Sequence, residues 1–235
     1  MQTHNMIIRP AAERGRSRRD WLDSRHTFSF AEYHDPRHMG FGALRVINDD
    51  RVAPGGGFAP HSHSDMDIIS YVLEGALQHR DSLGNGSVIR PGEIQRMRAG
   101  TGITHSEYNA SGSEAVHFLQ IWIIPQRRGL PPGYQQRGFK PEDIRGRWLK
   151  LATPENGGGL VNIHQDVALL ATRVAEQAVD YPLAQGRRAW LQVASGSVEV
   201  NGTTLGEGDS AALAGPAAIS VRGAPEGEVL LFDLQ

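Results

Sequence analysis

Residues 54–67 have the sequence PGGGFAPHSHSDMD, which places His61 and His63 two positions apart, just after a glycine-rich turn. In a β-strand, side chains two residues apart point to the same face of the sheet. His105 and Glu107 have the same spacing further along the chain. If the two segments lie side by side as strands, three imidazoles and one carboxylate converge on one point. This donor set can hold a metal ion.

The alternative interpretation of each histidine is a hydrogen-bonded residue of the protein interior. That explains one buried histidine well. It explains two pairs in register poorly, because four polar side chains at one buried point are costly without a partner. The chain has no cysteine, so nitrogen and oxygen atoms must hold any metal. Such a site suits one divalent transition ion (Fe, Mn, Co, Ni, Cu or Zn), and ligand softness alone does not choose among them.

Composition is typical of a globular protein: of 235 residues, 39% are hydrophobic and 21% charged, and the net charge is −2. This charge gives no indication of a nucleic-acid or membrane partner. Four arginines between positions 14 and 19 are expected to form a solvated loop. The first ten residues contain no long apolar segment, so we expect no signal peptide, no transmembrane segment and residence in the cytoplasm.

The sequence predicts an all-β protein with many tight turns. The 28 glycines and 13 prolines are scattered, and short runs rich in β-branched and aromatic residues lie between them. The runs interpreted as strands are 43–48, 67–73, 76–81, 116–124 and 228–234, with a hairpin at 83–86. The run 116–124 is apolar on both faces, which indicates a strand covered on both sides.

The spacing of turn residues and apolar runs in the last third of the chain repeats that of the first third, which predicts two domains. Gly196 corresponds to Gly75, and the metal-ligand positions of the first half correspond to Pro182 and Ala184 in the second. We therefore expect an N-terminal domain with the metal site at 1–125, a linker at 126–147 with a helical turn near its end, and a C-terminal domain without metal ligands at 148–235. The second domain could close the pocket of the first or form an oligomer contact.

The motifs around these histidines resemble those of the cupins. The first motif comprises Gly55, His61, His63 and Asp67, and the second comprises Pro91, Gly92, His105 and Asn109. More closely, the chain resembles a pirin-like bicupin over nearly its whole length. The segments that carry this resemblance are WLDS at 21–24, HTFSF at 26–30, MGF at 39–41, LRVINDD at 44–50, AGTGI at 99–103 and HSEYN at 105–109.

This resemblance implies two tandem cupin β-sandwich (jelly-roll) domains with one metal ion in the N-terminal domain. It implies that His61, His63, His105 and Glu107 are the metal ligands. It also implies quercetin 2,3-dioxygenase activity, in which O₂ opens the central ring of a flavonol and carbon monoxide is released. Glu107 would either stay on the metal or act as the catalytic base toward the flavonol hydroxyl.

Asp67 stands where cupins commonly have a glutamate. Asp65 lies two positions after His63, so on a continuous strand it would point to the same face as the two histidines. We expect Asp67, and less strongly Asp65, to orient a ligand imidazole or to contact solvent in the pocket. His79 and His117 are interpreted as packing or pocket-lining residues, and His26 as a residue of the pocket mouth.

Three functions remain open from the sequence. The first is a dioxygenase that takes a small aromatic substrate and O₂, and the second is a metal-bearing regulator that binds another protein. The third is another cupin reaction on a small oxygenated metabolite, since the fold does not decide among them. An enzyme requires an apolar cavity beside the metal, whereas a regulator requires a patch on its exterior. We expect a monomer, because tandem domains already supply the pair of sandwiches that other cupins obtain by dimerising.

Overall fold

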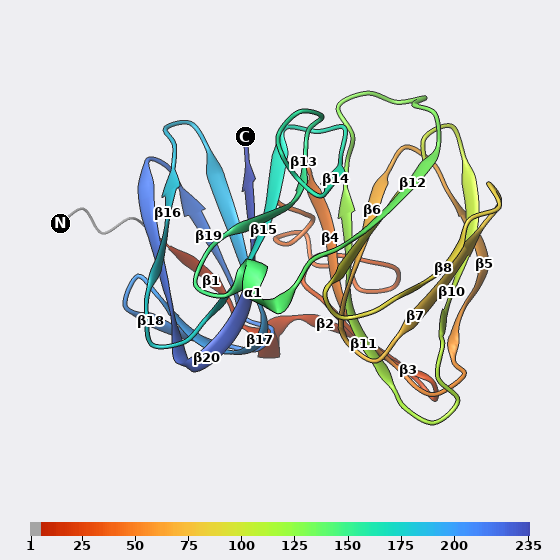
Figure 1. Cartoon of the computed structure of the whole chain (residues 1–235), viewed down its shortest axis with the longest axis horizontal. Coiled ribbons are helices and arrows are strands. Elements are labelled where there is room, and N and C mark those ends of the chain that lie inside the picture. The colour runs from red at the N-terminus through yellow and green to blue at the C-terminus, as the bar shows by residue number, and fades with distance from the viewer. Residues whose placement is uncertain (1–5) are drawn as a thin grey trace. The chain divides into compact units, whose positions relative to one another are not determined.

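The computed structural model of the chain describes residues 6–235, and its architecture is all-β, as predicted (Figure 1). Within these residues the helical segments are the 3-10 turn η1 (Ala11–Glu13) and the four-residue helix α1 (Pro141–Ile144). No helix among them is long and apolar enough to cross a membrane. The chain divides into two compact units, each built from β-strands.

The N-terminal unit comprises Gly15–Phe139 and Val161–Gln165. Its strands are β2 (Gly15–Arg19), β3 (Leu22–His26), β4 (Leu44–Val52), β5 (Gly57–His63), β6 (Asp67–Glu74), β7 (Leu77–Asp81), β8 (Gly86–Ile89), β9 (Glu93–Arg98), β10 (Ile103–Asn109), β11 (Val116–Ile123), β12 (Gly133–Gly138) and β14 (Val161–Asn162). One sheet has seven strands in the order β12-β9-β6-β11-β4-β3-β2, and the other has four in the order β5-β10-β7-β8.

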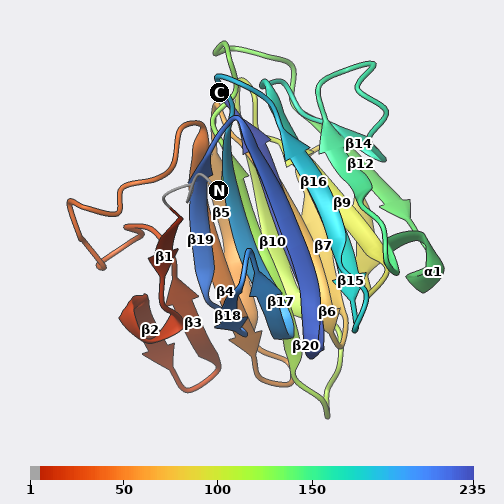
Figure 2. The same ribbon diagram turned by 90° about the vertical axis from the view of Figure 1, so that its left-hand side faces the viewer.

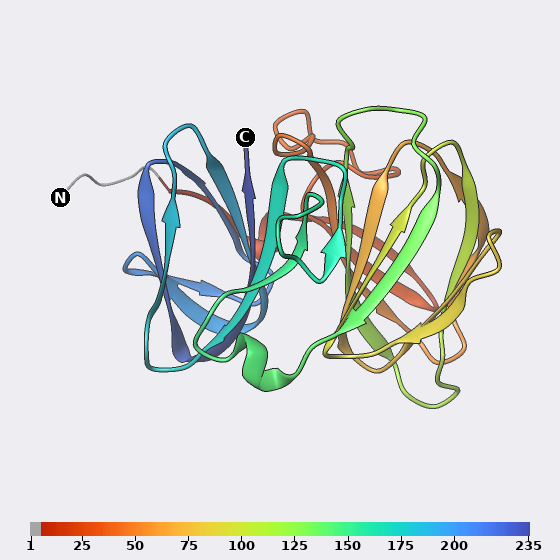
Figure 3. The same ribbon diagram turned by 45° about the horizontal axis from the view of Figure 1, so that its top comes forward.

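The two sheets of this unit share one apolar core, which makes the unit a β-sandwich (Figure 3). Val72, Val116 and Phe118 contribute to it from the larger sheet, and Leu77 and Ile89 from the smaller one. Strand β11 is buried along nearly its whole length. The apolar character of both its faces in the sequence is thereby explained.

The C-terminal unit comprises residues 6–14, Lys140–Leu160 and Asp166–Gln235. Its strands are β1 (Ile7–Arg9), β13 (Leu149–Thr153), β15 (Val167–Val174), β16 (Val179–Leu183), β17 (Arg188–Val200), β18 (Thr203–Gly206), β19 (Ser210–Ala214) and β20 (Ala217–Leu234). They pair in the order β1-β19-β17-β20-β15-β13, with β16 on β20 and β18 on β17 (Figure 2).

Strand β20 changes partner along its length, pairing with β16 over residues 217–221 and with β15 over residues 227–234. Residues from both parts, among them Ile219 and Leu231, enter a single core together with Leu191 and Val198 of β17. The long strands therefore supply both layers of the second sandwich.

The internal repeat predicted from the sequence is present in the backbone. Gly75 and Gly196 both have positive φ, at +75° and +71°. A Cβ atom at Gly75 would collide with the carbonyl oxygen of Ala115, and one at Gly196 with that of Glu226. Ala115 directly precedes the buried strand β11, and Glu226 directly precedes the buried end of β20. Both positions therefore require glycine for the same two reasons.

The observed division of the chain differs from the predicted boundaries at its start. Residues 6–14, predicted to belong to the N-terminal domain, group with the C-terminal unit. There β1 pairs with β19, and the backbone N–H of Ala11 donates to the Asp209 carboxylate at 2.7 Å. Such pairing is made by main-chain groups, which the composition of the segment does not reveal.

The predicted linker 126–147 also contains more structure than expected. Its helical turn is observed as α1, but β12 is a strand that pairs with β9 and extends the larger sheet of the N-terminal unit. The segment Val161–Gln165 returns to this unit, where the carbonyl of His164 accepts from the N–H of Gln126 at 2.8 Å.

The arginine-rich segment expected to be a solvated loop is strand β2, at the edge of the larger sheet. Arg16, Arg18 and Arg19 are exposed on it. Charged side chains on an edge strand discourage pairing with another chain, which suits this position.

Candidate metal centre

Strands β5 and β10 bring the predicted histidines together. The strands are antiparallel neighbours, and His105 lies directly opposite His61 in their register. The ring centroid of His61 is 4.5 Å from that of His105 and 4.8 Å from that of His63. The three imidazoles can each offer one nitrogen such that all three atoms lie within 4.8 Å of one another. The expectation that the two segments lie side by side is confirmed.

The state of these imidazoles fits a metal ion. Burial, reinforced by the neighbouring imidazoles, lowers the pKa of His63 to about 4 and that of His105 to about 3. Both rings are therefore neutral at pH 7 and carry a free lone pair. Nε2 of His105 is buried and has no hydrogen-bond partner among residues 6–235. A buried nitrogen left unpaired is costly, and coordination to a metal ion would remove that cost.

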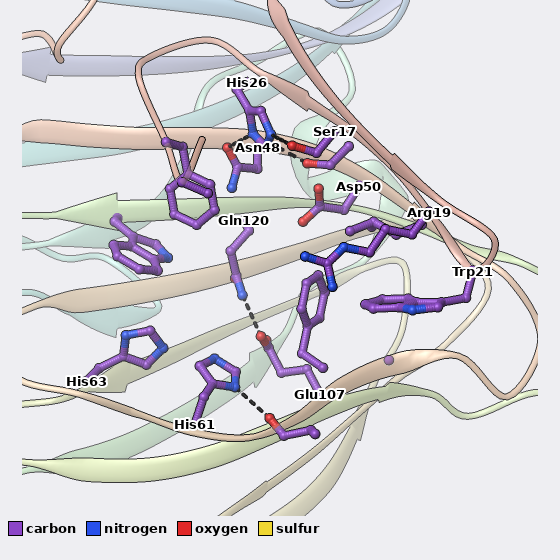
Figure 4. A pocket seen from close by; sticks show the side chains of 18 residues that line it. Ser17, Arg19, Trp21, His26, Asn48, Asp50, His61, His63, Glu107 and Gln120 are labelled. Carbon is purple, nitrogen blue, oxygen red and sulfur yellow. Dashed lines mark hydrogen bonds between the residues drawn. The ribbon is translucent and has the colours of Figure 1, made fainter. Parts of the chain in front are cut away.

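Glu107 lies beside the histidines but belongs to a second group. A bulge between His105 and Glu107 shifts the pairing of β10 with β5. The Glu107 carboxylate accepts a hydrogen bond from Nε2 of Gln120 at 2.7 Å (Figure 4). It accepts a second from Oγ of Ser70 at 3.2 Å. Its oxygen groups with the nitrogens of His79 and His105, again within 4.8 Å. Two groups of possible ligands thus share His105.

A buried chain of hydrogen bonds reaches His105 from behind. The Asp81 carboxylate lies 3.1 Å from Nε2 of His79, and Nδ1 of His79 lies 3.5 Å from Nδ1 of His105. Burial acts to raise the pKa of Asp81, but hydrogen bonds from Asn85, His79 and the backbone outweigh it and hold the pKa below its usual value.

An ionised Asp81 can only accept, so Nε2 of His79 carries a proton. With that proton on Nε2, Nδ1 of His79 can accept a hydrogen bond from Nδ1–H of His105. This leaves Nε2 of His105 as a bare lone pair, which is the form that binds a metal.

A cavity of about 580 Å³ opens beside His61, His63 and Glu107. Aromatic side chains form much of its wall in edge-to-face pairs. Trp21 packs on Phe58 at 5.2 Å, and Phe30 packs on Trp122 at 5.4 Å between ring centroids. Trp21 and Phe30 bring the N-terminal part of this unit into the cavity wall. The volume lies within the range of small-molecule sites.

Away from His61 and His63 the cavity has a second polar region, formed by Ser17, Arg19, His26, Asn48 and Asp50 (Figure 4), and Ser24 also lines the cavity. His26 was expected at the pocket mouth, and it does line the cavity, but as a buried residue.

Asp67 does not have the predicted role. It is buried at the start of β6, and its carboxylate accepts from the backbone N–H of His164 at 2.9 Å, with Arg98 3.7 Å away. Asp65 accepts from the backbone N–H of Gly129 at 2.8 Å. Neither residue lines the cavity. Both carboxylates hold loop segments, because the chain turns away from the site directly after His63.

His117 is a packing residue, as expected: its Nε2 lies 2.7 Å from the Asp49 carboxylate. His79 is more than that, since it touches His105 and belongs to the second group of possible ligands. Asp50, Gln120 and Asn48 were not predicted as pocket residues. Their positions depend on which face of each buried strand looks into the cavity. In strands that are covered on both sides, the sequence carries no signal for this.

Comparisons with known proteins show the family of the chain. The family model described as Pirin matches residues 8–123, and the model described as Quercetinase C-terminal cupin domain matches residues 150–234. The chain is 48% identical to a quercetin 2,3-dioxygenase of Escherichia coli K12, over 97% of this chain and 98% of that protein. It is 40% identical to a pirin-like protein of Caulobacter vibrioides, over 96% and 97% of the two chains.

Among solved structures, YhhW from Escherichia coli superposes with a TM-score of 0.93 at 44% identity, covering 98% of both chains. The structure of the bacterial pirin YhhW in complex with nickel(II) superposes with a TM-score of 0.92 at 45% identity, covering 98% of this chain and 99% of that one.

Proposed function

Because the chain belongs to the pirin family, we propose that it is a metal-dependent dioxygenase that opens the central ring of quercetin-like flavonols with O₂ and releases carbon monoxide. The observation that carries this proposal is the aromatic-walled cavity of about 580 Å³ that opens directly beside His61, His63 and Glu107. An enzyme needs such a cavity, whereas a regulator that acts through its exterior does not.

His61, His63, His105 and Glu107 would hold the metal. The first three offer imidazole nitrogens, and the fourth offers a carboxylate on the same strand as His105. A divalent ion bound there supplies a Lewis acid that lowers the pKa of a hydroxyl group beside it. The nickel(II) in the YhhW structure supports a divalent ion for a donor set of this kind.

The remaining chemistry falls to the side chains of this chain. Glu107 accepts the proton of the flavonol hydroxyl, and Gln120 and Ser70 fix the direction of its carboxylate through their hydrogen bonds. Trp21, Phe30 and the other aromatic side chains pack against the flat rings and keep water from the reacting carbons.

Oxygen uptake with quercetin tests the proposal. The protein would be loaded separately with Fe(II), Mn, Co, Ni, Cu and Zn, its metal content measured, and His61→Ala used as the control. Uptake with release of carbon monoxide, lost in the variant, is the expected result. Absence of uptake with every ion, in protein that holds one ion per chain, would contradict it and favour the regulator.

A further inference from the structure

The polar region of the cavity away from His61 and His63 contains one carboxyl group with an unpaired oxygen. Asp50, on β4, is 2% exposed, lines the cavity, and has an oxygen, Oδ1, without a hydrogen-bond partner among residues 6–235. The hydroxyl of Ser24 donates to the carboxyl and leaves this oxygen unpaired. A buried carboxyl oxygen in that state is costly unless a donor reaches it.

Arg19 also lines the cavity, but none of the described residues donates a hydrogen bond to this oxygen, and two of its polar neighbours are bonded to His26. Nδ1 of His26 lies 2.8 Å from Oδ1 of Asn48, and Nε2 of His26 lies 2.8 Å from Oγ of Ser17. Figure 4 shows this group above Asp50, on the side of the cavity away from His61 and His63.

The electrostatic surroundings of Asp50 suit it to pairing with a hydroxyl group. Burial, together with the nearby carboxylates of Asp49 and Glu107, raises the pKa of Asp50 to about 7. Near neutral pH the carboxyl therefore exchanges between an acceptor and a donor form. Either form pairs with a hydroxyl group, which can donate and accept.

We propose that Asp50 binds an outer hydroxyl group of the substrate, at the end of the cavity away from His61 and His63, and so selects polyhydroxylated aromatic molecules. This rests on the proposed function, and it adds the chemical feature by which the pocket distinguishes one flavonol from another. The ring system spans the aromatic walls, with its central hydroxyl at Glu107 and an outer hydroxyl at Asp50. A flavonol without outer hydroxyls leaves the buried oxygen unpaired and binds more weakly.

Equilibrium binding without turnover tests this proposal. The zinc-loaded protein would be titrated, under nitrogen, with quercetin and with 3-hydroxyflavone, which has the same ring skeleton and central hydroxyl but no outer hydroxyls. Quenching of tryptophan fluorescence reports binding, since Trp21 and Trp122 line the cavity. A hydrogen bond to a carboxylate predicts that quercetin binds about tenfold or more tightly.

Three variants separate the role of Asp50 from a general effect. Asp50→Leu should abolish most of the preference for quercetin. Asp50→Asn, which keeps the shape of the side chain and a neutral acceptor, should reduce it less and serves if the leucine variant does not fold. Asp49→Asn, one residue away and paired with His117, should keep the full preference.

Equal affinity of the two flavonols for the wild-type protein would overturn the role of Asp50. So would a preference that survives in both Asp50 variants, or one that Asp49→Asn reduces equally. Each of these results would leave the dioxygenase proposal intact. Binding of neither flavonol would overturn both proposals.

Discussion

Glu107 is held in the cavity by two side chains of the same unit, which fixes the direction in which it can take a proton. Replacing it with glutamine keeps the shape and removes the basicity. We expect the kcat of the Glu107→Gln variant to fall by roughly 100-fold or more, with a much smaller change in KM. Ser70→Ala removes the longer hydrogen bond to Glu107 together with the one to Gln120, but it keeps the basic carboxylate and should have a smaller effect. Unchanged kcat in a metal-loaded Glu107→Gln variant would exclude the role of Glu107 as base.

His79 determines which nitrogen of His105 is free. His79→Phe removes the acceptor for Nδ1–H of His105, so we expect metal affinity to weaken by about 10- to 100-fold. His79→Asn places an amide oxygen close to the lost nitrogen and should restore part of the affinity. Competition with a chelating dye measures both, and ¹⁵N NMR of the metal-free wild-type protein should show Nε2 of His105 unprotonated. Equal affinity in the phenylalanine variant would rule out this role.

Asp50 makes the stability of the metal-free protein depend on pH. Its pKa is about 7 in the folded state against a usual value of 3.8, so the folded protein binds this proton more tightly. The resulting stabilisation is complete below pH 3.8 and is lost as the pH rises through 7. The shift corresponds to a few kcal/mol, because one pKa unit corresponds to about 1.4 kcal/mol.

Asp50→Asn removes this titration. The variant should therefore be more stable than the wild-type protein at about pH 8, and the difference should shrink toward about pH 4.5. Urea denaturation of both metal-free proteins at several pH values measures it. A difference that does not change with pH would contradict the assignment.

At the scale of elements, the turn between β6 and β7 depends on Gly75. Its φ of +75° and the carbonyl of Ala115 both oppose a side chain there. We expect Gly75→Ala to lower the free energy of unfolding by roughly 1–3 kcal/mol. Gly84 has a φ of +88°, and a Cβ atom there would meet no atom within 4 Å, so Gly84→Ala isolates the cost of the backbone conformation, about 1 kcal/mol. Equal losses in urea denaturation would show that the collision at Gly75 is relieved.

The sequence predicted the strands that carry the ligands because their side-chain spacing is a property of each strand alone. His61 and His63 are observed on β5, and His105 and Glu107 on β10. The strands expected at 67–73 and 116–124, which carry none of these ligands, are observed as Asp67–Glu74 and Val116–Ile123. The contact of His105 with His79 could not be predicted, because it arises from the pairing of β10 with β7 on the side away from β5. Asp67 was misassigned for a related reason: its partner, His164, is 97 residues away in the chain.

At the scale of the whole molecule, the two units differ in chemistry despite the shared backbone. Both groups of possible metal ligands found in residues 6–235 lie in the N-terminal unit. From the repeat, Pro182 and Ala184 are expected to stand in the second unit where the first has His61 and His63. The segments that pass from one unit to the other, such as Val161–Gln165, were not predictable from composition because they are held by main-chain hydrogen bonds.

Metal removal should therefore destabilise one unit more than the other. A bound ion at about 1,000 times its dissociation constant stabilises the folded state by about 4 kcal/mol. We expect a chelator to lower the Tm of the transition that includes the N-terminal unit, as measured by scanning calorimetry. The chelator should have little effect on His61→Ala. An equal shift in that variant would indicate that the ion is bound elsewhere.

The hydrogen-bond chain behind His105 has a practical consequence for anyone who isolates this protein. Asp81 and His79 fix the tautomer of His105 before any ion binds. The site can therefore discriminate little between metal ions by rearranging. Affinities of nitrogen and oxygen sites then rise from manganese to copper in the usual order. We therefore expect the supply of metal ions in the cell to decide which ion the protein binds. A preparation from an overexpressing host will carry the ion that its growth medium provides, and activity assays should begin from stripped and deliberately reloaded protein.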